Sequence, residues 1–289
     1  MDRHTINNGS LSATIKADGA ELCSLRTADG RELLWQAGPE WPRHAPVLFP
    51  IVGRLKDDRL LHGGQSYRMT QHGFARDRRF AWEDSAPTSC RLSLADDAQT
   101  RALYPFAFRL ELSFELDGNS LTVRHTLTNP GEEVLPASVG AHPAFRWPLA
   151  DGLPKEAHAL VFEKDEPAPI RRVDGGLLSP TPEPTPIQGR RLPLSEGLFA
   201  ADAVILDQPA SRSVRFEAPG APSITVSWDG FTELGIWSKP GGAPFLCIEP
   251  WRGHASPAGF DGPFLDKPGL MQLAPGDMRE LSYRVTVGA

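Results

Sequence analysis

Apolar and polar residues alternate with a period of two in several stretches of the chain. In the clearest stretch the apolar residues Leu110, Leu112, Phe114 and Leu116 are interleaved with Glu111, Ser113 and Glu115. Asp117-Gly118-Asn119 follows as a turn, and the alternation resumes over residues 121–127. This period is that of a half-buried strand, so the pattern predicts two antiparallel strands joined in a hairpin.

Further strands are predicted at 19–25, after a turn at Asp18-Gly19, and at 224–228 and 281–287. The chain contains 27 glycines and 28 prolines, which leave few windows free for a helix. Strands joined by turns predict an all-β fold of antiparallel sheets packed face to face. No repeat of fixed period is visible, which argues against a propeller or a solenoid.

We expect one domain over residues 1–289, because the strand pattern is alike on both sides of residues 165–195. That segment is rich in proline, glycine and serine and predicts a long surface excursion. A domain boundary there is the alternative.

Composition narrows the class of protein. Hydrophobic residues make up 40% and charged residues 23%, as in a globular chain with a packed core. A net charge of −6 argues against a nucleic-acid partner. The polar N-terminus and the lack of a run of about 20 apolar residues argue against a signal peptide and a membrane partner. The three cysteines, Cys23, Cys90 and Cys247, are odd in number and far apart, so we expect reduced thiols and a cytoplasmic protein.

Four segments are too polar, or too rich in glycine and proline, for ordinary strands. They are Pro46–Arg54, Gln71–Arg76, Gly140–Phe145 and Leu246–Trp251. The guanidinium of Arg54 suits sugar hydroxyls or a phosphate, although the segment also fits an edge strand with Arg54 in solvent. Glycine beside His72 permits a ligand to approach closely, although such a pair also occurs by chance in loops.

His142 and Glu249 each precede a proline, which holds their backbone extended amid apolar neighbours. Partial burial of Glu249 would raise its pKa toward that of a useful base. The alternatives are a structural, hydrogen-bonded histidine and a surface or paired carboxylate.

Taken together and in order, these blocks resemble the aldose 1-epimerase (galactose mutarotase-like) superfamily, in particular its LacX-like branch. The resemblance spans nearly the whole chain and rests on Gly53-Arg54, the block from His72 to Arg76, the block from His142 to Phe145, and the block from Ile248 to Trp251. It implies an antiparallel β-supersandwich with a sugar cleft across one sheet. It also implies acid–base chemistry without a metal or an organic cofactor.

The resemblance implies roles for individual residues. Glu249 matches the catalytic carboxylate and His142 the catalytic acid. The residues that match sugar contacts are His72, Arg54, Arg76 and Asp202, with Asp207 as the alternative to Asp202. Where galactose mutarotases carry a Tyr-Phe-Asn-like stretch, this chain has Pro143-Ala144-Phe145, so galactose preference stays open.

The predicted function is interconversion of the α and β anomers of a hexose. Glu249 takes the proton of the C1 hydroxyl while His142 delivers one to the ring oxygen, and a neighbouring carboxylate is expected to raise the pKa of His142. Trp251, Trp237 and Phe74 are candidates for an apolar platform under the sugar. For Trp237 core packing is favoured, and His125 is expected in the core or on the cleft floor.

Three other functions remain open at this point. The extra arginines would suit a hexose-6-phosphate 1-epimerase. A glycoside hydrolase would use Glu249 and Asp202 as its two carboxyl groups. A non-catalytic sugar-binding protein would share the fold. The histidines form no zinc-type pair, so no metal is expected. The expected partner is a small sugar, and the chain is expected to be a monomer or a homodimer.

Overall fold

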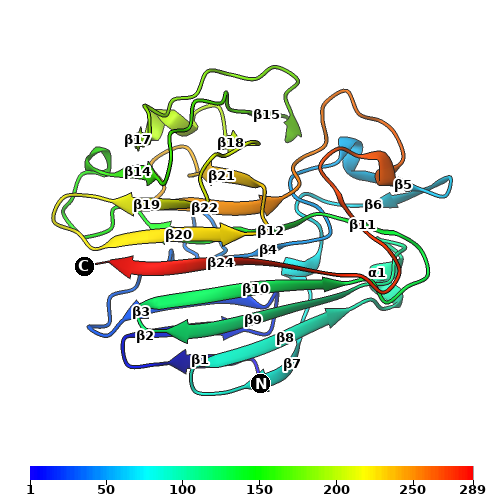
Figure 1. Cartoon of the computed structure of the whole chain (residues 1–289), viewed down its shortest axis with the longest axis horizontal. Coiled ribbons are helices and arrows are strands. Elements are labelled where there is room, and N and C mark those ends of the chain that lie inside the picture. Colours follow the sequence, from blue (N-terminus) through cyan, green and yellow to red (C-terminus); the bar gives the residue numbers. More distant parts are fainter. Residues whose placement is uncertain (289) are drawn as a thin grey trace.

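The structure, a computed structural model, describes residues 1–288 and consists mainly of β-strands joined by turns (Figure 1). In these residues the one α-helix is α1 (Ala98–Arg101), which begins at a capping box between Asp97 and Thr100. The 3-10 turns are η1 (Lys56–Asp58), η2 (Ala75–Asp77), η3 (Lys155–Ala157), η4 (Glu196–Phe199) and η5 (Phe264–Asp266). The predicted all-β fold is confirmed. None of the helices in residues 1–288 combines the length and the apolar character that crossing a membrane requires.

The largest sheet has nine antiparallel strands and holds most of the strands that the alternation predicts. Its order is β17 (Arg191–Pro193), β14 (Ala159–Phe162), β19 (Ser213–Glu217), β20 (Ser223–Asp229), β24 (Met278–Gly288), β10 (Ser120–Thr128), β9 (Arg109–Asp117), β8 (Ser89–Ala95) and β7 (Ala81–Ser85). The predicted hairpin is β9–β10, in which Asp117 pairs with Ser120 across a two-residue turn. Buried and exposed positions alternate along both strands, so one face of this sheet packs on the core.

A second sheet has six strands: β18 (Val204–Leu206), β21 (Glu233–Trp237), β22 (Phe245–Arg252), β12 (Val139–Ala141), β4 (Val47–Leu48) and β13 (Ala144–Arg146), the last paired with β22. A third sheet contains β1 (Arg3–Asn7), β2 (Leu11–Lys16) and β3 (Glu21–Thr27). Three two-stranded ladders complete the fold: β5 (Arg59–His62) with β6 (Gln65–Arg68), β11 (Leu135–Ala137) with β23 (Met271–Leu273), and β15 (Val173–Asp174) with β16 (Leu177–Leu178).

The central strand β22 is buried on both of its faces. Leu246 and Ile248 belong to the main core, whereas Cys247 and Trp251 belong to smaller apolar clusters. Because side chains of a strand alternate between its faces, Glu249 shares the face of Cys247 and Trp251, away from the main core. A carboxyl group therefore occupies a position that is usually apolar.

The strand next to β22 is interrupted at the level of Glu249. β12 pairs with residues 251–252 of β22 and β13 pairs with residues 245–247, so residues 248–250 face the link His142-Pro143. The N–H of Ile248 donates to the carbonyl of Pro143 at 3.3 Å. This interruption brings His142 beside Glu249, although 106 residues lie between them in the sequence.

Two segments lie at the border of the six-stranded sheet. β4 is its edge strand, which is the alternative that the sequence leaves open for the segment Pro46–Arg54. The proline-rich excursion (residues 165–195) returns to the sheet, where Arg171 bridges to Ile205 of β18; Leu178 bridges to Pro257, which lies beyond the end of β22. β15 of this excursion lies above β21 near the top of Figure 1. The single domain over residues 1–289 stays a prediction.

Candidate active site

A cavity of about 280 Å³ opens on the face of the six-stranded sheet that carries Glu249. The polar and charged side chains in its wall are those of Gln71, His72, Arg76, His142, Asp202 and Glu249. The volume lies just below the range of about 300–1,000 Å³ that is usual for small-molecule sites. The cavity therefore suits a ligand of monosaccharide size.

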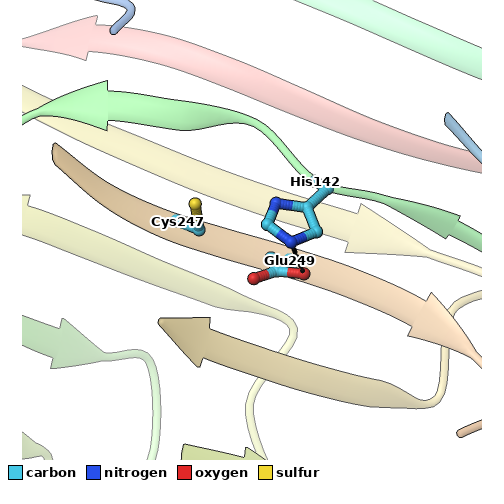
Figure 2. Close-up of side chains that lie close together, drawn as sticks. All are labelled: His142, Cys247 and Glu249. Carbon is cyan, nitrogen blue, oxygen red and sulfur yellow. Dashed lines mark ion pairs between the residues drawn. The ribbon is translucent and has the colours of Figure 1, made fainter. Parts of the chain in front are cut away.

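His142 and Glu249 lie together in this cavity. Nε2 of His142 is 3.1 Å from Oε2 of Glu249, and Figure 2 shows the imidazole facing the carboxyl group over β22. The two residues are 7% and 1% exposed. The contact lacks hydrogen-bond geometry and leaves Oε2 of Glu249 without a hydrogen-bond partner within residues 1–288; Nδ1, the other ring nitrogen of His142, has none there either. A buried polar group without a partner is costly, which is typical of a site that a ligand completes.

Burial favours the uncharged form of both side chains. It raises the pKa of Glu249 well above its usual value of 4.5; the indole of Trp251 opposes this shift, and the charge of Asp202 adds to it. Burial also lowers the pKa of His142 to about 3. The expectation that a neighbouring carboxylate raises the pKa of His142 is therefore wrong, because the loss of hydration outweighs that attraction.

The pair nevertheless holds the proton that acid–base chemistry needs. The pair of a protonated Glu249 and a neutral His142 holds the same number of protons as the pair of an ionised Glu249 and a protonated His142. The two forms differ only in whether Oε2 or Nε2 carries it, and the pair titrates as a unit.

The backbone of Gly53 holds His72 at two points. The N–H of His72 donates to the carbonyl of Gly53 at 2.7 Å, and the N–H of Gly53 donates to Nδ1 of His72 at 3.1 Å. Because Nδ1 accepts, the proton of the neutral ring is on Nε2. Burial lowers the pKa of His72 well below 6.5, and the neighbouring His142 acts in the same direction. His72 therefore offers a neutral N–H donor.

Arg76 and Asp202 lie in the cavity wall, as the sequence predicts. Nη2 of Arg76 donates to the carbonyl of Gln71 at 2.7 Å, and its buried Nε has no hydrogen-bond partner in residues 1–288. Burial lowers the pKa of Arg76 to about 10, so it stays charged at neutral pH. Asp202 has a φ of +67°, and its carboxylate accepts the N–H of Ala203 at 2.7 Å.

Arg54 and Asp207 point away from this constellation. Arg54 makes two hydrogen bonds to Asp58, at 2.7 and 3.0 Å, and its stem lies behind Gly176, which does line the cavity. Asp207 is paired with Arg171 at 3.3 Å. The structure thus places Asp202, of the two candidate aspartates, in the cavity wall. Local sequence does not reveal this, because it depends on tertiary contacts such as the pairing of Asp207 with Arg171.

Comparison with known proteins places this arrangement in a family. The family model described as aldose 1-epimerase matches residues 2–262. The chain belongs to the aldose 1-epimerase family. It is 33% identical to protein LacX of Lactococcus lactis subsp. lactis over 294 aligned residues, which cover 98% of each chain. The expected resemblance to the LacX-like branch is confirmed.

Solved structures agree with this assignment. The fold resembles a galactose mutarotase related enzyme from Lactobacillus acidophilus, with a TM-score of 0.92, 32% identity, and coverage of 99% of this chain and 97% of the other. It also resembles a galactose mutarotase-like protein from Lactobacillus casei ATCC 334, with a TM-score of 0.91, 32% identity and coverage of 99% of both chains. The predicted galactose mutarotase-like β-supersandwich is confirmed.

In this aldose 1-epimerase family member, tryptophans form much of the apolar wall. Trp251 lines the cavity as predicted, and so does Trp237, for which core packing was favoured. Phe74 instead packs in the main core against Phe49 and Tyr104, so the platform interpretation of Phe74 is wrong. Sequence reasoning missed Trp41, which lies in a loop without alternation and stacks on His142 with ring centroids 4.9 Å apart.

Cys247 is the remaining reactive side chain near the pair. It lies two residues before Glu249 on β22, and one donor atom each from His142, Cys247 and Glu249 lies within 4.8 Å of the others. These are the residues that could hold a metal ion. The rest of the cavity wall offers what a sugar needs, namely hydrogen-bonding groups together with aromatic faces.

Proposed function

We propose that this protein is an aldose 1-epimerase that interconverts the α and β anomers of a hexose. Glu249 is the base and His142 is the acid of the ring-opening step. The observation that carries the proposal is the contact of 3.1 Å between a carboxyl group and an imidazole in the wall of a cavity of sugar size.

The reaction needs two proton transfers. Glu249 takes the proton of the C1 hydroxyl while His142 gives one to the ring oxygen, so the C1–O bond of the ring opens to the free aldehyde. Rotation about C1–C2 presents the other face of the carbonyl. The roles of the two groups then reverse as the ring closes, which returns both protons.

The proposed chemistry begins from the neutral pair. Placing substrate hydroxyls at the unpaired atoms of the two side chains would solvate their charged forms, and the proton would move from Oε2 of Glu249 to Nε2 of His142. The N–H of His72 and the charge of Arg76 would stabilise negative charge that develops on the sugar oxygens. Asp202 would accept hydrogen bonds from sugar hydroxyls and orient the ring. Arg54 would act only after leaving Asp58.

The test is anomer exchange measured by polarimetry on freshly dissolved α-glucose, α-galactose and glucose 6-phosphate. Wild type is compared with Glu249→Gln and His142→Ala. Each substitution is expected to lower the rate by roughly 10²- to 10⁴-fold, because each removes one partner of the proton transfers. Glu133→Gln and His62→Ala, which change residues outside the cavity wall, serve as matched controls and should keep the wild-type rate.

The choice of sugar and the rival functions are decided by the same assay. Preference for glucose 6-phosphate would assign the protein as a hexose-6-phosphate 1-epimerase and give Arg76 a phosphate to bind. Binding of a sugar in calorimetry without any acceleration would overturn the catalytic proposal in favour of a sugar-binding protein. Hydrolysis of a glycoside that survives His142→Ala would point to a hydrolase.

A further inference from the structure

We propose that His142, Cys247 and Glu249 form a three-ligand site for a thiophilic divalent metal ion such as Zn²⁺, which blocks the catalytic pair when it binds. Within residues 1–288 these side chains form the one cluster of three or more potential metal ligands. The blocking of catalysis rests on the proposed function, whereas the binding of the metal does not.

The spacing of the donor atoms fits a tetrahedral ion. Zn²⁺ binds histidine nitrogen and carboxylate oxygen at about 2.0–2.2 Å and cysteine sulfur at about 2.3 Å, so neighbouring ligand atoms lie about 3.3–3.7 Å apart. Nε2 of His142 and Oε2 of Glu249 are already 3.1 Å apart. The donors of the cluster lie within 4.8 Å of one another, so a contraction of about 1 Å at most completes the triangle.

Local structure explains why the three side chains converge. Cys247 and Glu249 are two residues apart on β22 and so point to the same face. His142 faces them from the link between β12 and β13 (Figure 2). The ring of His142 packs against Trp41 and Trp237, so any shift toward the sulfur must move with these rings.

The ligand set selects the kind of metal. One sulfur, one nitrogen and one oxygen suit Zn²⁺ or Co²⁺, whereas Mg²⁺ and Ca²⁺ prefer oxygen alone. On binding, the sulfur coordinates as the thiolate and its proton passes to solvent. Three protein ligands leave the fourth position open. His142 and Glu249 line the cavity, so that position faces the place where a sugar would bind.

A second observation supports a ligand here. Oε2 of Glu249 and Nδ1 of His142 are buried without a hydrogen-bond partner in the described residues. A metal ion at Oε2 would satisfy the carboxylate, whereas Nδ1 of His142, whose N–H a metal-binding histidine usually donates to a second group, has no partner in the described residues. The same ion would occupy both atoms that the proton transfers require, so metal binding and catalysis exclude each other.

The first experiment measures binding without reference to activity. The full-length protein, freed of metal with a chelator, is titrated with Co²⁺ and its absorption spectrum is recorded. Wild type should bind one equivalent and show a near-ultraviolet thiolate-to-cobalt charge-transfer band, and Cys247→Ala should lack that band. Cys90→Ala is the matched control, because Cys90 is also buried but lies on β8 in the other sheet.

The second experiment measures anomer exchange with Zn²⁺ or Mg²⁺ present. Zn²⁺ should inhibit wild type and Cys90→Ala, whereas Cys247→Ala should keep its basal rate and need at least about tenfold more Zn²⁺. Mg²⁺ should not inhibit. If Cys247→Ala does not fold, Cys247→Ser takes its place, since a hydroxyl gives no thiolate band.

The outcomes separate the two proposals. A cobalt band that persists in Cys247→Ala, or its absence from wild type, would overturn the metal site. A cobalt band in a protein without epimerase activity would leave the metal site standing and overturn the proposed function. Equal Zn²⁺ sensitivity of wild type and Cys247→Ala would show that the inhibiting ion binds elsewhere.

Discussion

Glu249 shows how the surroundings of one residue decide its chemistry. Glu133, another glutamate of the chain, is exposed to solvent, whereas Glu249 is 1% exposed and lies beside the ring of His142. Removal from water raises the pKa of Glu249 and lowers that of His142 to about 3, so burial reverses the usual order of the two values and leaves the proton on Glu249. In the proposed mechanism, contact with the substrate has to restore the charged pair before Glu249 acts as the base and His142 as the acid.

Trp41 is expected to hold His142 in place and to stabilise its protonated form. The two rings stack with an interplanar angle of 27°, and an aromatic face attracts a cation by about 1–2 kcal/mol when water is excluded. Trp41→Leu should therefore lower kcat roughly 5- to 30-fold and lower the pKa at which activity is lost on raising the pH. Trp41→Phe keeps an aromatic face and should retain most of the rate. Polarimetry over a range of pH measures both effects.

Two results would contradict this role for Trp41. If the pH profile of Trp41→Leu equals that of wild type, the indole of Trp41 does not stabilise the protonated form of His142. An equal loss in Trp41→Phe would assign the effect to the indole itself.

At the scale of elements, Gly73 joins the segment that carries His72 to the chain after β4. Its φ is +70°, and it forms a parallel bridge with Phe49. A Cβ on Gly73 would lie 2.2 Å from the carbonyl oxygen of Phe49, closer than any real contact. A side chain here must push the two segments apart.

Gly73→Ala should therefore lower the free energy of unfolding by at least about 2 kcal/mol, since strain at positive φ and a backbone clash add. It should also slow anomer exchange, because His72 moves with its neighbour. The matched control is Gly63→Ala, with a φ of +55° and open space for the Cβ among the described residues; it should cost only about 1 kcal/mol. Denaturant unfolding of both variants measures the difference, and equal costs would contradict the clash.

At the scale of the whole molecule, the stability of the fold depends on pH through histidines buried in the core. His125 of β10 is 1% exposed and packs edge to face on Phe231, so it is a core histidine. Burial lowers the pKa of His125 to about 4, from 6.5 in the unfolded chain. Between these two values the unfolded chain binds more protons than the folded one, so the free energy of unfolding falls as the pH falls from 6.5 to 4.

His125→Leu should remove this dependence. The gap between the folded and unfolded pKa values of His125 corresponds to roughly 3 kcal/mol of unfolding free energy. Between pH 6.5 and pH 4, the free energy of unfolding of wild type should therefore fall by this amount more than that of the variant. Denaturant unfolding at several pH values compares the two proteins. A constant difference between them at all pH values would show that His125 does not titrate during unfolding.

Much of the architecture follows from the sequence alone. The hairpin β9–β10 and the strands β20 and β24 were predictable because a sheet with one buried face forces apolar residues to every second position. The order of the four unusual blocks identified the family, and that resemblance assigned Glu249, His142, His72, Arg54, Arg76 and Asp202, with Asp207 as the alternative, to one site. The structure brings all of these except Arg54 and Asp207 to one cavity, while their chemical roles stay a proposal.

Only the tertiary structure decided which side chains meet. Phe74 packs in the main core and Trp237 lines the cavity, the reverse of what was expected. Arg54 is paired with Asp58. Trp41, which lies in a loop, contacts His142 in the site. The contact of His142 with Glu249 depends on a strand interruption that faces β22, and the balance of their pKa values depends on what covers them. A local pattern reveals which face of a segment is buried, because burial acts on each residue. It does not reveal which distant segment covers that face, because that choice belongs to the packing of the whole chain.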